Sequence, residues 1–451
     1  MKNLIIFPLI ILLILAVRLA LFYSHPPLLH DHQHVSFSTT LLSDPKISGN
    51  SQQFTAKYGN FWYFTNVKIV AQQFPSFTYG NYLTIDGTVK NIFPQQNFQG
   101  KNSGSSASTT TGKAPSNVKP VLTISFPKIM LDLSKQNPFL LFLNGFRGRM
   151  RDFYEQTLPA TSASLLLGIV FGIAQNLPKD FQTNLQSTGL THVVAASGMN
   201  VTMVGGFLLG VLGIVGGLLK RQLLLFLVIV GLALYATLSG LQASILRATL
   251  MFGSVLLAQA LGRQYSAFYI LTIVGAVMLF LNPLLVSDVG FLLSFFSTIG
   301  IIFIQPILPF SNIISDDIKT TASAQLATVP ILLTTFGQYS LLSLLTNALV
   351  LWTIPPLMVL GGVGALIGLV FEPLGKIFIY LCFPFLLFFE WIVTFFGSLH
   401  WSLTATNIPL QFIFGYYLIL LSVVLVLRRH QRKHIDPLSH GHIVDNETIE
   451  Q

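Results

Sequence analysis

The sequence predicts a polytopic α-helical membrane protein with a small all-β domain outside the cytoplasm. Of its 451 residues, 52% are hydrophobic and only 9% are charged, whereas soluble domains carry about 25% charged residues. The mean hydropathy is +0.68. Residues 23–138 interrupt this pattern, because they are rich in Ser, Thr, Asn, Gln and aromatic residues. We therefore expect a water-exposed β domain within a membrane protein.

The first apolar segment, Leu4 to Phe22, is about as long as a bilayer is thick. Arg18 falls near its far end, where a long side chain can reach the interface. A cleaved signal peptide is the alternative. However, the stretch is long for one, and HPPLLHDHQH (25–34) follows it in place of a small-residue cleavage site. Residues 1–22 are therefore predicted to form a retained transmembrane anchor.

Residues 23–138 contain short alternating runs that end at Gly or Pro, as half-buried strands do. They are FWYFTNVKIVA (61–71), NYLTIDGTVKNI (81–92) and VLTISFPKIM (121–130). Residues 100–117 have the composition of a flexible loop between two strands. Twelve Lys and Arg stand against six Asp and Glu between Tyr23 and Ala160. This excess predicts a polyanion or a membrane surface as partner, with a merely solvated basic face as the alternative.

Residues 139–160 carry alternate cations beside aromatic residues, at Arg147, Arg149 and Arg151. This spacing favours an amphipathic segment at the membrane interface, with the Arg side chains reaching lipid phosphates. The phosphate backbone of a nucleic acid is the alternative partner for the same cations.

Residues 161–427 are predicted to be embedded in the membrane. Their apolar runs make about nine or ten elements, and several are too short or too interrupted by Gly and Pro to be simple spans. RRHQRK (428–433) directly follows the last run, so residues 428–451 are expected to form a cytoplasmic tail. The β domain is then expected outside the cytoplasmic (inner) membrane.

Three polar stretches interrupt this apolar region. They are GLTHVVAASGMN (189–200), SGLQASILRATLMF (239–252) and NPLLVSDVGFLLSF (282–295). A charge near the centre of a spanning helix costs about 2.5–3.5 kcal/mol, so such groups face the protein interior or water. The stretches are therefore predicted to line a passage, or to form the polar seam that holds one together.

Individual residues in these stretches allow more than one interpretation. A helix break at Ser197-Gly198 would expose N–H groups that suit an anion. His192 is either a titrating or phosphate-contacting group, or a packed histidine bonded to a carbonyl. Arg247, which follows Gln242, keeps its charge and needs a carboxylate, carbonyls or an anionic ligand. Asp288 is the nearest acidic residue along the chain, and a phosphate contact is the alternative.

The sequence offers little for metal or nucleotide chemistry. HDHQH (30–34) lacks the surrounding Asp and His that a metal site needs, and Cys382 is the single cysteine. No GxxxxGK[ST] string occurs, so no P-loop is expected. Glu390, an isolated acid in an apolar run, is expected to pair with a polar neighbour. We expect no metal and no cofactor.

The three polar stretches together resemble the ComEC family of bacterial inner-membrane DNA-uptake channels. The resemblance covers about residues 158–371 and includes ATVPILLTTFG (327–337) and Asn347 followed by Pro355. Asn200 departs from it, because the family usually has His there. The matching residues are Gly189, Leu190, His192, Ala195, Ser197 and Gly198; Arg247-Ala248 with Gly262-Arg263; and Asn282-Pro283 with Asp288, Gly290, Phe291, Leu293 and Ser294.

The resemblance implies that residues 23–138 form an OB-like domain and that residues 161–427 form a competence channel for single-stranded DNA. Phe61, Trp62 and Tyr63 would stack on bases, with Lys68 beside them, unless these aromatics belong to the core. The expected path residues are His192, Ser197, Asn200, Gln242, Arg247, Asp288 and Ser294.

The metallo-β-lactamase-like domain that many members carry does not follow the channel segment, so the chain is expected not to be an enzyme. Single-stranded DNA, membrane lipid, a cytoplasmic helicase and a separate nuclease are then the expected partners, and a homodimer is left open. Two other functions also stay open, a small-solute or lipid transporter on the same scaffold and a structural membrane subunit.

Overall fold

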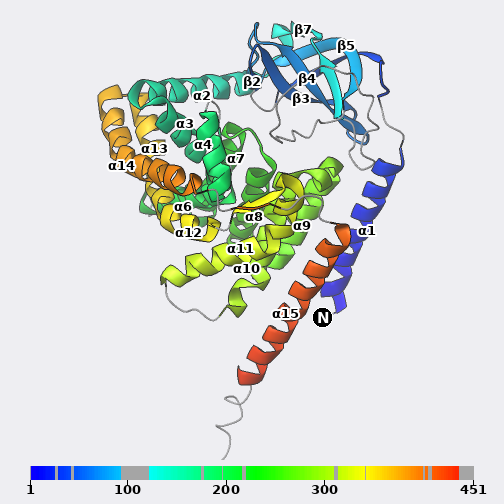
Figure 1. The fold of residues 1–451 in the computed structure, drawn as a ribbon, viewed down its shortest axis with the longest axis vertical. Helices are drawn as coiled ribbons and strands as arrows, with labels where there is room; N and C mark the ends of the chain where they lie inside the picture. Colours follow the sequence, from blue (N-terminus) through cyan, green and yellow to red (C-terminus); the bar gives the residue numbers. More distant parts are fainter. Residues whose placement is uncertain are drawn as a thin grey trace, which may run out of the picture. The chain divides into compact units, whose positions relative to one another are not determined.

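A computed structural model describes residues 2–25, 29–41, 45–92, 121–173, 177–195, 197–215, 220–308, 313–340, 342–399, 402–404 and 409–435. The predicted loop at residues 100–117 lies outside these ranges. The chain divides into two compact units (Figure 1). We call Leu12–Arg149 the β unit, and Met1–Ile11 together with Met150–Gln451 the helical unit.

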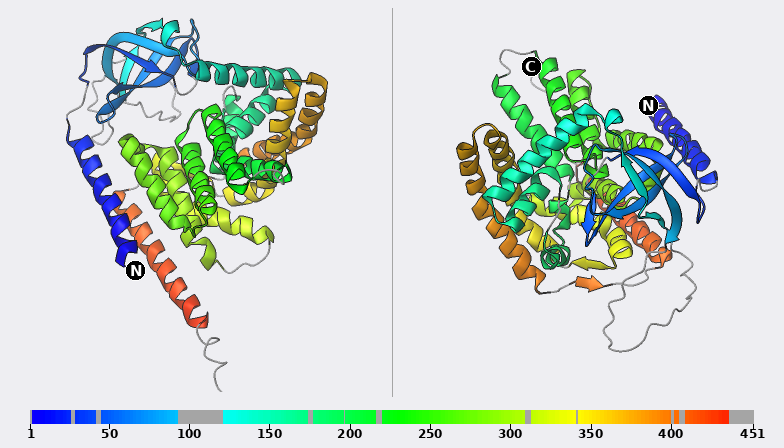
Figure 2. Two further views of the ribbon diagram at one scale, coloured as in Figure 1. Left: turned by 180° about the vertical axis from the view of Figure 1, so that it is seen from behind. Right: turned by 90° about the horizontal axis from the view of Figure 1, so that it is seen from above.

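The β unit is built on one seven-stranded sheet with the order β1-β5-β6-β4-β3-β2, in which β7 pairs with β5. β4 and β6 run parallel, and the other neighbours are antiparallel. Figure 2 shows the strands curving around one core. The strands are β1 (His34–Thr40), β2 (Lys46–Ser48), β3 (Ser51–Gly59), β4 (Phe64–Gln72), β5 (Tyr82–Ile92), β6 (Val121–Ser125) and β7 (Lys128–Leu131).

These strands confirm the all-β prediction and correct its details. The expected strand over 61–71 begins later, at Phe64, and Phe61 to Tyr63 lie in the loop before it. The expected strand over 121–130 is two strands, separated by Phe126-Pro127. From Val67 to Ala71 of β4 every second side chain is buried, as alternation requires. The core residues of the unit include Phe54, Val67, Ile69, Leu83, Ile85, Val89 and Ile124.

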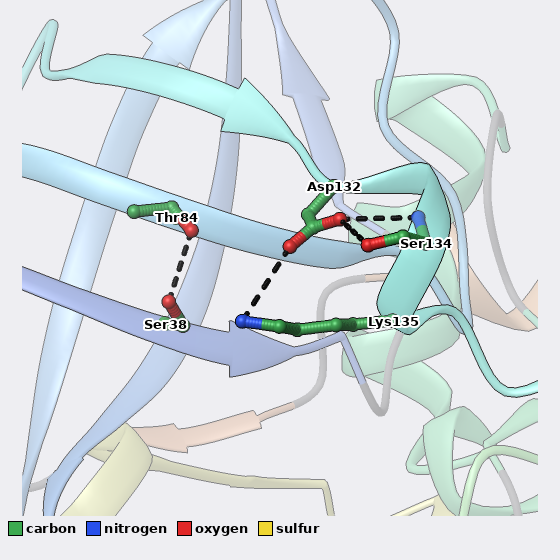
Figure 3. Close-up of polar contacts among 5 residues, drawn as sticks. All are labelled: Ser38, Thr84, Asp132, Ser134 and Lys135. Carbon is green, nitrogen blue, oxygen red and sulfur yellow. Dashed lines mark hydrogen bonds and ion pairs between the residues drawn. The ribbon is translucent and has the colours of Figure 1, made fainter.

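Polar side chains at the surface of the β unit bond one another (Figure 3). Ser38 Oγ and Thr84 Oγ1 lie 2.9 Å apart across β1 and β5. After β7, Asp132 caps the short helix η1 (Leu133–Lys135), accepting from the Ser134 N–H at 3.0 Å and the Ser134 hydroxyl at 2.6 Å. The Lys135 ammonium lies 3.7 Å from the same carboxylate. The Ser134 hydroxyl, with further help from the backbone and Lys135, lowers the pKa of Asp132.

The helical unit confirms the polytopic membrane prediction. In the described part of the chain, six helices are long and apolar enough to span a membrane. Four further apolar helices have 10–17 residues, as expected for interrupted elements. The spans are Arg221–Leu238, Ala243–Ala260, Val289–Ile307, Ser343–Gly368, Glu372–Gly397 and Gln411–Arg429.

Two helices contain the boundaries between the units, α1 (Lys2–Ser24) and α2 (Pro138–Thr157). The remaining elements follow in chain order: α3 (Ala160–Phe171), α4 (Lys179–Thr188), α5 (Thr191–Val194), α6 (Gly198–Val215), α7 (Arg221–Leu238), α8 (Ala243–Ala260), α9 (Ala267–Leu281), η3 (Pro283–Ser287), α10 (Val289–Phe303), η4 (Gln305–Ile307), α11 (Ile313–Phe336), β8 (Gln338–Ser340), α12 (Ser343–Val350), η5 (Leu351–Thr353), α13 (Ile354–Gly368), α14 (Glu372–Gly397), β9 (Ser402–Thr404) and α15 (Leu410–Ile435).

Glycines let these helices approach closely, as is typical where both partners are apolar and lipid gives little drive for association. A Cβ built on Gly364 of α13 would lie 2.7 Å from Phe378 Cβ of α14, and Figure 2 shows the two helices side by side. Gly300 of α10 packs directly on the backbone of Ser323 in α11. Helix α3 packs against α13, α14 and α5.

Candidate functional site

Helix α3 ends inside the helical unit, and this end organises the polar residues around it. Ten of its 12 residues are buried. Gly172 ends the helix at φ 70°, a left-handed conformation in which glycine is unstrained. The last carbonyls of any helix lack partners within the helix. At membrane depth each of them must find a donor elsewhere.

Three side chains from elsewhere in the helical unit supply these donors. Asn200 Nδ2 donates to the Ile169 carbonyl at 2.8 Å. The Tyr235 hydroxyl donates to the Val170 carbonyl at 2.9 Å. Gln242 Nε2 donates to the Gly172 carbonyl at 3.2 Å. We call Asn200, Tyr235 and Gln242 the α3 cap.

The α3 cap changes the interpretation of two predicted path residues. Asn200 is 1% exposed, whereas Gln242 is exposed, and each side chain donates to a carbonyl at the end of α3. Tyr235 was missed at the sequence level. An isolated tyrosine in the apolar run 222–238 was the available signal, because a buried hydroxyl needs a partner.

The break before α6 contains two more predicted residues. The Ser197 hydroxyl donates to Asn200 Oδ1 at 2.8 Å. His192 is exposed, and its Nδ1 lies 2.9 Å from the Gly189 carbonyl. His192 therefore has the carbonyl contact of one interpretation, but its side chain is not packed as that interpretation requires. Ser197 is half-buried and supports the α3 cap through Asn200.

Arg247 lies near the start of α8 and is only 6% exposed. One guanidinium nitrogen donates to the hydroxyl of Thr298 on α10, and that hydroxyl donates to the Ser294 carbonyl at 2.9 Å. Nε of Arg247 is buried without a hydrogen-bond partner in the described part of the chain. The guanidinium also lies against the first residue of α6, since a Cβ on Gly198 would be 3.6 Å from Nη2.

Asp288 does not neutralise Arg247. Its carboxylate caps α10, accepting from the Phe291 N–H at 2.7 Å, and among the described residues no ion pair joins it to Arg247. Asp and Asn are favoured N-caps because their side chains satisfy a first-turn N–H. Proximity along the chain suggested a pair, but the capping geometry turns the carboxylate onto its own helix.

Thr298 is the second residue that sequence reasoning missed. It links the Arg247 side chain to the Ser294 carbonyl, and so joins two of the three polar stretches. The signal was a hydroxyl stripe at Ser294, Ser297 and Thr298, spaced to share one helix face. Ser294 itself contributes its carbonyl to this arrangement, which also accepts from the Ser297 hydroxyl at 3.0 Å.

Glu390 pairs with a polar neighbour, as expected. It accepts from the Ser162 hydroxyl at 2.7 Å, which joins α14 to α3. Within the described ranges, no group of three or more His, Cys, Asp or Glu side chains is placed so that it could hold a metal ion. In the histidine-rich run before β1, the His34 ring faces Asp86 at 3.3 Å across the strand pair.

The aromatic loop of the β unit packs against α1. Arg18 is 3% exposed and donates to the carbonyls of Trp62 at 2.9 Å and Phe61 at 3.1 Å. Its guanidinium also lies 5.2 Å from the Trp62 ring centroid, while Tyr63 stacks on His25. Phe61 and Trp62 are still about half exposed, at 50% and 52%, so they are not core residues. Lys68 is half-buried on β4.

The three arginines of α2 have different environments. Arg147 is 6% exposed, and its guanidinium lies 4.8 Å from the Tyr79 ring centroid in the β unit. This contact corrects the expected interfacial role of Arg147, because the charge is covered by an aromatic face. Arg149 is exposed and Arg151 is half-buried, so the interfacial interpretation stays open for these two alone.

Comparisons with known proteins agree with this architecture. A family model described as "Competence protein" matches residues 169–430. ComE operon protein 3 of Bacillus subtilis (strain 168) is 28% identical over 211 residues, which are 45% of this chain and 26% of that protein. The match therefore spans about a quarter of the relative's length. No solved structure matches. Because the family model covers more than half of the chain, from the end of α3 to the end of the last span, this protein belongs to the ComEC family of competence proteins.

Proposed function

We propose that the helical unit forms a channel through which single-stranded DNA crosses the cytoplasmic membrane into the cell. The observation that carries this proposal is the state of Arg247. Its guanidinium is 6% exposed within an apolar helix, and no acidic side chain in the described part of the chain pairs with it. An arginine cannot shed its charge in a protein. A buried cation of this kind is stabilised by an anionic ligand, and DNA presents one on every nucleotide.

The surroundings of Arg247 favour a phosphate in the same place. The guanidinium lies beside Gly198, the first residue of α6. First-turn N–H groups of a helix have no partner inside the helix, and the positive end of the helix dipole is located there. The lack of a side chain at Gly198 lets Ala248 and the Arg247 guanidinium come close to this helix end, 3.3 and 3.6 Å from the Cβ position. A phosphate oxygen placed there would meet the guanidinium and the helix end together.

The remaining polar residues would also hold the helix ends that border the passage. The α3 cap and Asp288 each complete a helix end. Few fixed cations then meet the strand, which favours passage over trapping. The β unit, with twelve Lys and Arg against four Asp in residues 12–149, would gather DNA on the outer side. A cytoplasmic helicase and a separate nuclease would supply the drive and the processing.

The test is uptake of labelled DNA by a transformable host that lacks its own channel, receives this chain and is supplied with a nuclease. We expect uptake with the wild-type chain and a loss of at least about tenfold with Arg247→Ala, which removes a charge-assisted phosphate contact. Arg221→Ala is the matched control, because Arg221 is an exposed arginine at the start of α7. Its uptake should match wild type.

Two results would contradict the proposal. One is no uptake by a correctly inserted wild-type chain, and the other is full uptake with Arg247→Ala. Passage of small solutes without DNA would instead favour a transporter on this scaffold. An inserted chain that supports neither kind of passage would favour a structural subunit.

A further inference from the structure

The β unit contains an open cavity of about 640 Å³ at one end of β3 and β4. Its six lining residues are Asn50, Ser51, Gln72, Gln73, Phe74 and Phe126, and we call this the amide–aromatic pocket. It is separate from the aromatic loop at Phe61 to Tyr63, whose Trp62 carbonyl and ring are engaged by Arg18. All six residues belong to the β unit, so the pocket is complete within it.

One wall of the pocket is held by a buried glutamine. Gln52 is 2% exposed, and its Nε2 donates to the carbonyls of Gln72 and Pro75, both at 2.7 Å. Its Oε1 accepts from the Phe77 N–H at 3.1 Å. The Gln73 N–H also donates to the Asn50 carbonyl at 3.1 Å. The segment that carries Phe74 is therefore anchored on both sides.

Phe126 also lines the pocket, and it has an unusual backbone. Its φ is 52°, in the left-handed region that a bulky residue rarely adopts. The conformation is held by its N–H, which donates to the Val70 carbonyl at 2.6 Å. The next residue, Pro127, packs on Gly87, because a Cβ built on Gly87 would lie 3.0 Å from Pro127 Cβ. Yet the Phe126 side chain is 62% exposed. Core packing does not account for holding an exposed ring in this way, and strain of this kind is typical of ligand sites.

The chemistry of the pocket matches a nucleobase. Phe74 is 74% exposed, and neither its ring nor that of Phe126 contacts another aromatic ring in the described ranges. The side-chain amides of Asn50, Gln72 and Gln73 make no hydrogen bond among the described residues. No charged residue lines the pocket, so phosphate is not favoured there, and four polar side chains disfavour an acyl chain.

We propose that the amide–aromatic pocket binds a single nucleobase of the incoming strand, stacked on Phe126 or Phe74 and hydrogen-bonded through its edge to the amides. Base–aromatic stacking tolerates every base, because each base has a π face. Side-chain amides offer a donor and an acceptor together, which matches the mixed edges of the bases. The inference rests on the proposed function for the source of the strand, but the pocket itself can be tested without transport.

The test uses the full-length chain in nanodiscs of zwitterionic lipid. Fluorescence anisotropy compares a labelled single-stranded oligonucleotide with an abasic strand of equal length and charge. We expect wild type to prefer the base-bearing strand about tenfold, in line with one stacked base. Phe126→Gly removes the ring and suits the left-handed backbone, so the variant should fold. It should lose the preference while it keeps its affinity for the abasic strand.

Two further variants sharpen the result. Gln72→Leu removes one amide and keeps the strand backbone, so it should weaken the same preference. Leu133→Ala changes a side chain that is 74% exposed and does not line the pocket, so it should behave as wild type. Equal binding of the two strands by wild type, or an unchanged preference in Phe126→Gly, would overturn the pocket proposal.

A neutral probe separates the pocket from the channel. Adenosine binding is measured by saturation-transfer NMR on the same nanodiscs. If the chain supports no DNA uptake but adenosine binds to wild type and not to Phe126→Gly, the pocket proposal stands while the proposed function is contradicted. If adenosine does not bind and no base-dependent preference is found, the pocket proposal is wrong.

Discussion

The ends of η1 in the β unit and of α3 in the helical unit are capped by residues at very different distances along the chain. In the β unit, Asp132 caps η1 two residues away and Asn60 accepts from the N–H of Tyr63 three residues away. In the helical unit, the α3 cap joins residues 31, 65 and 70 positions apart. Strand ladders already pair most backbone groups in a sheet, whereas an interrupted helix in a membrane leaves carbonyls that only another element can reach.

This difference changes how polar residues in the two units are interpreted. An isolated polar residue in a spanning segment is a functional candidate by default. Here Asn200, Gln242 and Asp288 each form a hydrogen bond with a backbone group, and this structural role accounts for a polar residue at each position. Arg247 keeps a buried Nε without a partner among the described residues, and it is the candidate that structure alone does not explain.

The largest expected effect tests the close packing of the helical unit. In Gly300→Ala the new methyl would collide with the Ser323 backbone and with Ala327 Cβ at 2.8 Å. We expect the free energy of unfolding to fall by about 3 kcal/mol, the upper part of the range for overpacking. Chemical unfolding in detergent micelles would measure it. Gly253→Ala is the control, because nothing lies within 4 Å of its Cβ position. Equal stability of the two variants would contradict the packing argument.

The α3 cap is tested by Asn200→Leu, which keeps the size of the side chain and removes both of its hydrogen bonds. The buried Ile169 carbonyl would lose its donor. The free energy of unfolding should fall by about 2 kcal/mol, the cost of an unsatisfied buried group. Thr202→Val is the control, since its exposed hydroxyl bonds only the Gly198 carbonyl in its own helix. A similar loss in both variants would show that the long-range bond is not special.

In the β unit, Arg18→Met removes two hydrogen bonds to the aromatic loop and the contact with the Trp62 ring. We expect the free energy of opening the loop over residues 60–63 to fall by about 1 kcal/mol, because partly buried hydrogen bonds and cation–π contacts are each weak. Hydrogen exchange of the loop peptide measures this. Arg149→Met changes an exposed arginine and should leave that exchange unchanged. Unaltered exchange in Arg18→Met would mean that the loop does not depend on α1.

The smallest effect concerns pH. The pKa of Asp132 is lowered in the folded state, chiefly by the Ser134 hydroxyl. Its ionised form therefore stabilises the fold above the pKa of the unfolded carboxyl, about 3.9, and this stabilisation is lost as pH falls through the lower folded value. Asp132→Asn should make the stability of the β unit depend less on pH between about pH 5 and 2. Tm measured across that interval checks it, and an unchanged slope would assign no role to the cap.

Much of the fold could be predicted because its signals are local. Hydropathy and alternation predicted the polytopic helical unit and the all-β unit, and the structure confirms both. Sequence motifs predicted the family, which the family model confirms. The errors occur where a local signal has two structural outcomes. Phe61 to Tyr63 have strand-like residues but lie in a loop held by Arg18, and Arg147 has interfacial spacing but packs on Tyr79.

By itself, the sequence determined that this chain is a membrane protein of the ComEC family with a basic, all-β segment, because composition, periodicity and motif spacing are properties of neighbouring residues. Only the tertiary structure decided what each polar residue is bonded to. It assigned Asn200, Tyr235 and Gln242 to the end of α3, Asp288 to the start of α10, and Thr298 to Arg247. The physical reason is that a buried polar group bonds the partner that is nearest in space, and in an interrupted helical bundle that partner can lie tens of residues away along the chain.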